Sequence, residues 1–169
     1  IRLALRMTRE FLERGYTDPA SAINKSRLGQ NYTLPKHEAL RAILIGNNPV
    51  YNEKLSAIGN PLDSRLNKTN AQMLRLFIMS ALFRMSSEKS TGYIDGVDIR
   101  KNLREIGFSD DLTIKVLVDL CRLRFIQTHS HQEATFDSSF FLTRLGGHMI
   151  KDLLSDMSFL ENIMMDTFI

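Results

Sequence analysis

Residues 109–146 read SDDLTIKVLVDLCRLRFIQTHSHQEATFDSSFFLTRLG, and this stretch decides the fold of the second half of the chain. Ser109–Asp111 places a favoured N-cap serine before two aspartates, which would complement the helix dipole in the first turn. The helix is expected to run to about Leu123. The runs Phe125–Thr128 and Ser139–Leu142 predict two strands, and the polar residues between them predict the loop of a β-hairpin.

The elements that precede this stretch complete a known order. Thr69–Met85 carries an apolar stripe at helical spacing, and Val97–Ile106 predicts a second helix that ends at Gly107. Tyr93–Ile94 predicts a short strand between these two helices. Helix, strand, helix, helix, hairpin is the order of a winged helix-turn-helix domain. The turn Leu142–Gly146, directly after the second hairpin strand, supports this prediction.

The first half of the chain predicts a helical bundle. Three amphipathic segments are expected to form helices, at residues 1–14, 17–27 and 33–45. The turn-forming run Gly59–Asp63 marks a joint, so we expect two domains, at 1–60 and 61–169. The second domain includes helices after the hairpin, the last at Phe159–Ile169 and packed on the winged helix. The predicted fold class is therefore mainly α, with a small β-hairpin wing.

The composition is that of a globular protein. Of the 169 residues, 43% are hydrophobic and 24% are charged, which is enough apolar sequence to bury a core. The sequence has no apolar run of about 18 residues and no signal-peptide pattern. Cys121 is the single cysteine, which suits a reducing cytosol, so we expect a cytoplasmic protein without a membrane partner. Because the chain begins at Ile1 rather than at methionine, we expect a fragment of a longer protein.

Parts of the first half are similar to a known family. The segments Ile1–Leu5, Phe11–Gly15 and His37–Leu40 resemble the helical lid of P-loop ATPases of the AAA+ and STAND type. In those proteins the lid follows the nucleotide-binding core, and a winged helix follows the lid. The resemblance implies that residues 1–60 are a lid-like subdomain and that Arg2 senses the phosphates of a bound nucleotide.

The sequence does not contain the catalytic parts of such an ATPase. It has neither the G-x-x-x-x-G-K-[ST] phosphate loop nor an aspartate-bearing strand for magnesium. We therefore expect no catalytic residue, cofactor or metal in this chain, and no ATP hydrolysis by this chain alone. ATP and Mg are expected only with an upstream ATPase core. That core or another protein is the expected partner.

Five basic side chains of the predicted winged helix are candidates for nucleic-acid contact. They lie on its second and third helices: Arg100, Lys101, Arg104, Lys115 and Arg122. The third helix would enter the major groove, but its outward side also carries acidic and apolar residues, and the hairpin loop has no Lys or Arg. Phosphate-binding surfaces carry an excess of positive charge. Contact with a protein is therefore favoured, and DNA binding is the alternative.

Two other classes of function fit the same residues. A stand-alone DNA-binding regulator would use residues 1–60 for dimerisation or ligand sensing, whereas a non-catalytic interaction module would bind neither nucleotide nor DNA. His129 and His131 have a spacing that some metal sites use, but no third ligand is evident, so an exposed loop is the expected setting. The Met- and Phe-rich C-terminus predicts either a packed helix or a docking surface.

Overall fold

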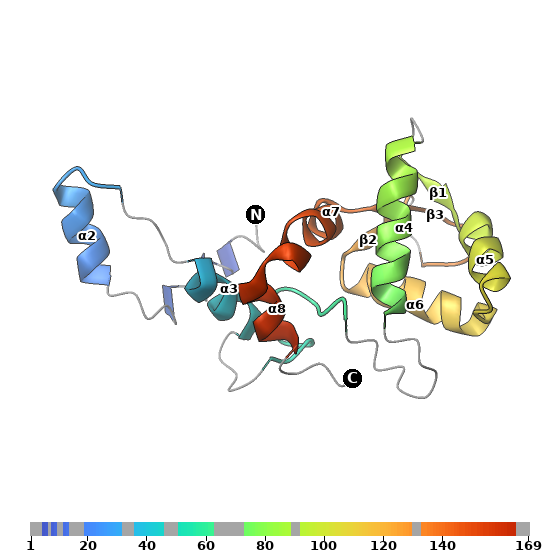
Figure 1. Ribbon diagram of the computed structural model, residues 1–169, viewed down its shortest axis with the longest axis horizontal. Coiled ribbons are helices and arrows are strands. Elements are labelled where there is room, and N and C mark those ends of the chain that lie inside the picture. Colours follow the sequence, from blue (N-terminus) through green and yellow to red (C-terminus); the bar gives the residue numbers. More distant parts are fainter. Residues whose placement is uncertain are drawn as a thin grey trace. The chain divides into compact units, whose positions relative to one another are not determined.

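The computed structural model describes most of the chain (Figure 1). The described residues are 5–6, 8–9, 12–13, 19–31, 36–45, 51–62, 73–88, 92–129 and 133–164. Within them the fold is mainly helical, with a small antiparallel sheet of three strands, as the sequence predicts for the fold class. The chain divides into two compact units, and the first joins Ile1–Asn60 to Asp156–Thr167. The second unit contains Pro61–Ser155.

The first unit contains three helices among its described residues. They are α2 at Pro19–Arg27, α3 at Lys36–Ile45 and α8 at Met157–Met164. Helices α3 and α8 pack together, and Leu44 and Phe159 are fully buried. The short segment before residue 60 is tied to α8, because the Asn60 side chain donates a hydrogen bond to the carbonyl oxygen of Ile163 at 3.2 Å. In the expected helix at residues 1–14, each described residue is helical, and Arg2 lies outside the described residues.

The position of the last helix differs from the expectation. The sequence places the C-terminal helix with the winged helix, but the structure groups α8 with the first unit. The physical reason is the burial of Phe159 and Ile163, each with no exposed surface, in the unit that also contains α3. An apolar stripe shows that a helix is buried but does not show which element buries it.

The second unit alternates helices and short strands. In chain order they are α4 at Leu74–Glu88, β1 at Ile94–Asp95, α5 at Gly96–Glu105, α6 at Asp110–Arg122, β2 at Ile126–Thr128, β3 at Ser139–Leu142 and α7 at Arg144–Lys151, followed by a short 3₁₀ turn at Leu153–Ser155. The strand order is β1-β3-β2, and both pairs are antiparallel. Ile94 pairs with Phe140, and Ile126 pairs with Leu142.

Side-chain caps define where the later helices begin. The Ser109 hydroxyl accepts a hydrogen bond from the Leu112 backbone N–H at 3.3 Å, at the start of α6. Thr143 caps α7 in the same way, through the Gly146 N–H at 3.1 Å. Gly107 has a φ of 101°, a backbone conformation that favours glycine, and it ends α5 as the sequence predicts. These local signals agree with the tertiary fold.

The core of the second unit lies between α4, α6 and the sheet. Ile78 of α4 and Leu117 of α6 are buried against this sheet region together with the strand residue Phe140. Helix α7 packs so closely on Phe125 that only glycine fits at position 146, since a Cβ atom there would lie 2.2 Å from the carbonyl oxygen of Phe125. Burial of these apolar side chains supplies the main favourable free energy of the unit.

Candidate functional site

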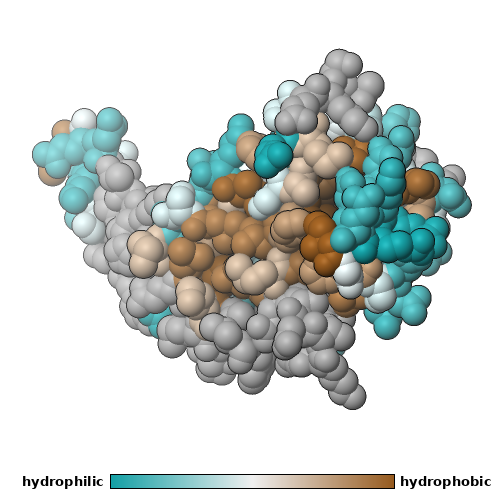
Figure 2. Space-filling view, turned by 45° about the vertical axis from the view of Figure 1, so that its right-hand side comes forward, coloured by the Kyte–Doolittle hydropathy of each residue, from teal (hydrophilic) through white to brown (hydrophobic). Residues whose placement is uncertain are grey.

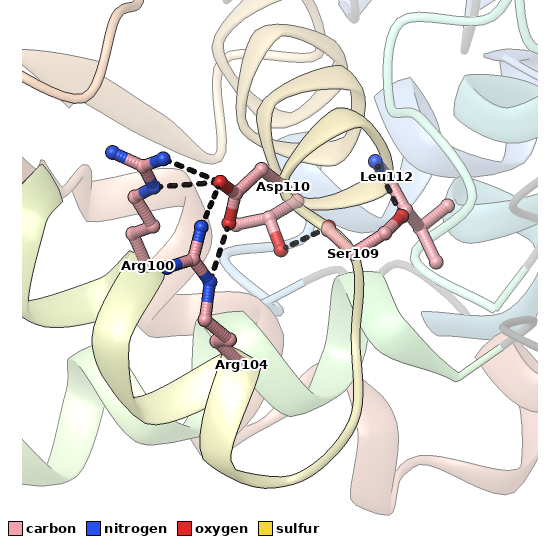
Figure 3. A network of polar contacts seen from close by, with 6 residues as sticks. Arg100, Arg104, Ser109, Asp110 and Leu112 are labelled. Atoms are coloured by element: carbon pink, nitrogen blue, oxygen red, sulfur yellow. Dashed lines mark hydrogen bonds and ion pairs between the residues drawn. The ribbon is translucent and has the colours of Figure 1, made fainter.

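Two of the five residues predicted to contact nucleic acid, Arg100 and Arg104, form hydrogen bonds with the carboxylate of Asp110. Figure 3 shows Arg100 and Arg104, both from α5, pointing toward Asp110 at the start of α6. The Nε of Arg100 lies 2.9 Å from Oδ2 of Asp110, and the Nε of Arg104 lies 3.3 Å from Oδ1. The Arg100 guanidinium also lies 4.9 Å from the ring centre of Phe136, a cation–π distance. The geometry therefore joins α5 to α6 through a shared acid.

The electrostatics of this cluster keep Asp110 charged. Hydrogen bonds from Arg100 and then from Arg104 lower the pKa of the Asp110 carboxyl from 3.8 to about 2. The reciprocal hydrogen bond with Asp110 raises the pKa of Arg100. Asp110 also lies in the first turn of α6, where the helix dipole favours a negative charge. Both arginines therefore have a carboxylate partner, and a phosphate would have to compete with it.

Arg122 also has an acidic partner. Its Nε and terminal nitrogen lie 3.1 Å and 2.7 Å from Oδ1 of Asp119. The other oxygen of Asp119 accepts a hydrogen bond from Arg75, whose side chain is 1% exposed. Asp119 thus forms ion pairs with a buried arginine and an exposed one at the same time. Buried arginines need such compensation, because the desolvation of an unpaired charge is costly.

Lys101 and Lys115 differ from the three arginines. Both are exposed, and none of the described residues forms an ion pair with either lysine. On the outer side of α6, Lys115 lies among Asp111, Val118 and Arg122, all of them exposed. This face carries two basic side chains, one acidic side chain and one apolar residue. Figure 2 shows mostly hydrophilic residues, with a few hydrophobic ones among them, on the right-hand side of the view.

An apolar groove lies between α4 and α5, and the sequence alone did not indicate it. Its volume is about 110 Å³, and residues of both helices line it: Phe77, Ile78, Ala81, Leu82, Met85, Ile99, Asn102, Leu103 and Ile106. Phe77 is 46% exposed and Ile106 is 59% exposed. The apolar stripe of α4 predicted burial, but only the packing of α5 leaves part of it open. The groove is therefore an unfilled apolar surface of the second unit.

A second depression is lined by both polar and apolar residues, and the sequence did not indicate it either. It has a volume of about 390 Å³ and lies where α7 meets α4. Its basic side chains are Arg144, His148 and Lys151, all of them exposed. Their spacing of four and then three residues is a signal that the sequence carries, because such residues share one face of a helix.

The described residues offer no metal site and no reactive thiol. None of the groups of His, Cys, Asp and Glu among them could hold a metal ion. His129 contacts the Tyr93 ring at 4.7 Å between centres, and His131 lies outside the described residues. Burial raises the pKa of the Cys121 thiol to about 11, so this cysteine stays protonated at neutral pH. It is a packing residue of α6.

Comparisons with known proteins add no relative. No family model, curated protein or solved structure matches this chain. Among the described helices, none is long and apolar enough to cross a membrane.

Proposed function

We propose that the second unit is a winged-helix domain that binds a partner protein through the groove between α4 and α5. The order of its elements supports the fold assignment, because β1 follows α4 and the β2–β3 hairpin follows α6. The antiparallel order β1-β3-β2 is consistent with a hairpin wing. The proposal gives this domain no catalytic role.

The observation that carries protein binding is the exposed apolar groove. Phe77 and Ile106 lie at its edges, and aromatic or aliphatic side chains of this kind form the energetic centre of protein interfaces. The groove follows α4 from Phe77 to Met85, about two helical turns. An amphipathic helix of a partner could place its apolar face there.

The ion pairs of the arginines count against the DNA-binding alternative on α5 and α6. Arg100 and Arg104 share Asp110, and Arg122 pairs with Asp119. Counterion release by Lys and Arg supplies most non-specific affinity for DNA, and a side chain that already pairs with a carboxylate contributes less. Lys101 and Lys115 are the residues on which that alternative would depend.

We further propose that the chain works beside a P-loop ATPase core, on the strength of the resemblance of its first 60 residues to ATPase lids. ATP and Mg would bind to that core, and Arg2 would sense the phosphates. Reading the coding sequence before Ile1 tests this idea, and a phosphate loop there should be accompanied by slower ATP turnover in the Arg2→Ala variant. Normal turnover in that variant would exclude the role of Arg2.

Photo-crosslinking tests the groove. A photoreactive phenylalanine in place of Phe77, in the protein expressed from its natural gene, should crosslink to one protein partner. The same group at Lys101, outside the groove, is the matched control and should not crosslink to that partner. Adding Ile106→Ser should weaken binding of the identified partner by about 10-fold or more, equivalent to the loss of an apolar contact. Crosslinking at both positions, or to DNA, would contradict the proposal.

A further inference from the structure

Helix α7 carries a row of three basic side chains. Arg144, His148 and Lys151 are spaced by four and three residues, so they lie along one face over about 10 Å of helix. All three are exposed, and all three line the second depression, which lies where α7 meets α4. Gly147 lies between them, and an added Cβ there would come no closer than 4.0 Å to its nearest neighbour, Leu142. The surface beneath the row is therefore open.

The two outer cations of this row have no acidic partner. None of the described residues forms an ion pair with Arg144 or Lys151, whereas His148 Nδ1 lies 2.6 Å from Oδ2 of Asp152. The ammonium group of Lys151 lies 5.2 Å from the ring centre of Phe83. Asp152 is thus the one acid among the residues that line the depression. Basic side chains outnumber it.

The helix dipole explains part of this row but not all of it. A cation is stabilised in the last turn of a helix, where Lys151 lies. Arg144 is in the first turn, where the positive end of the dipole disfavours a cation. An exposed arginine in that position gains nothing from its own helix, so an external anion is the partner that would stabilise it.

We infer that the α7 row binds the phosphodiester backbone of a nucleic acid without reading its bases. A linear set of cations suits a chain of phosphates, and the arginine fork matches a phosphate group. A folded protein partner would need an apolar contact at the centre of its interface. None of the large hydrophobic residues described as exposed lies between residues 142 and 152. This inference does not rest on the proposed protein-binding groove.

Fluorescence anisotropy with a labelled mixed-sequence DNA tests the inference, using one duplex probe and one single-stranded probe. At about 50 mM salt, the double variant Arg144→Ala/Lys151→Ala should bind about 10-fold more weakly than the natural chain. The slope of log K against log salt should become shallower by about 1.4–1.8. Comparison of the two probes shows which form of backbone is the better ligand.

The matched control removes the same charge from another face. Lys101→Ala/Lys115→Ala also lowers the net charge by two but leaves α7 unchanged, so its affinity and slope should stay close to those of the natural chain. Equal losses in the two double variants would overturn the inference, as would the absence of binding at about 50 mM salt. Thermal melting of each variant keeps loss of folding distinct from loss of binding.

A variant with the opposite effect completes the test. Asp152→Asn removes the acid that borders the row, and it should raise the affinity for both probes by about threefold. Asp111→Asn makes the same charge change on α6 and should leave the affinity unchanged. A gain of equal size in Asp111→Asn, or no gain in Asp152→Asn, would show that the α7 row is not the binding surface.

Discussion

The α5–α6 corner and the face of α7 both carry basic residues, but the two regions use them differently. At the corner, Arg100 and Arg104 share the carboxylate of Asp110. On α7, Arg144 and Lys151 have no ion-pair partner among the described residues. The corner therefore uses its cations to hold two helices together, whereas α7 presents them to solvent. The number of basic residues on a helix does not measure the charge available to a ligand.

The largest loss of stability is expected where an ion-paired arginine is also buried. Asp119→Ala should lower the free energy of unfolding by about 3 kcal/mol, because Arg75, which is 1% exposed, would lose a carboxylate partner. Urea denaturation measures this change. Arg122→Ala removes the exposed partner of the same carboxylate and should change stability by about 0.5 kcal/mol or less. Similar losses in the two variants would mean that the pairing of Arg75 is unimportant.

The second prediction concerns the close packing of α7 at Gly146. Gly146→Ala should destabilise the unit by about 2 kcal/mol, since the new Cβ would meet the Phe125 carbonyl oxygen at 2.2 Å and Cδ1 of Leu142 at 2.8 Å. Gly147→Ala, one residue later, has room for the methyl group. It should be neutral or stabilising by about 0.5 kcal/mol, because alanine favours the helix. Thermal unfolding of both variants would show whether α7 is fixed at Gly146.

The smallest expected effect concerns the protonation of Asp110 at the α5–α6 corner. The pKa of Asp110 is lowered from 3.8 to about 2, so its pairing stabilises the fold above about pH 4 and is lost as the pH falls toward 2. Carbon-detected NMR of the Asp110 carboxyl should follow this titration. Arg100→Ala should raise the pKa more than Arg104→Ala, because the hydrogen bond from Arg100 is the larger cause. An unchanged pKa in both variants would contradict the arrangement at this corner.

Local signals were sufficient to predict most elements of the second unit. The N-cap residue Ser109 and the terminal Gly107 define helix ends that the structure reproduces within a residue or two. The two hairpin strands were predicted because short apolar runs flank a polar loop. These features depend on neighbours in sequence, so sequence patterns report them well.

Features that depend on distant residues were not predicted. The partner of Arg100 and Arg104 is Asp110, a carboxylate whose distance from them depends on how α5 and α6 pack. The open groove beside Phe77 depends on how α4 and α5 pack. The row on α7 was visible in the spacing of its residues, but its significance came from the absence of acidic partners among the described residues. A sequence gives the charges, and the fold decides which of them meet.

The grouping of α8 with α3 has a consequence for the order in which the chain folds. Pro61–Ser155 is continuous in sequence, so this segment can fold once it has left the ribosomal exit tunnel. The first unit must wait, because Asn60 bonds to Ile163, 103 residues further along the chain. Residues 61–155 can therefore leave the ribosome and fold before residues 156–167, which the first unit needs, are available. The two units therefore differ in when they can fold during translation.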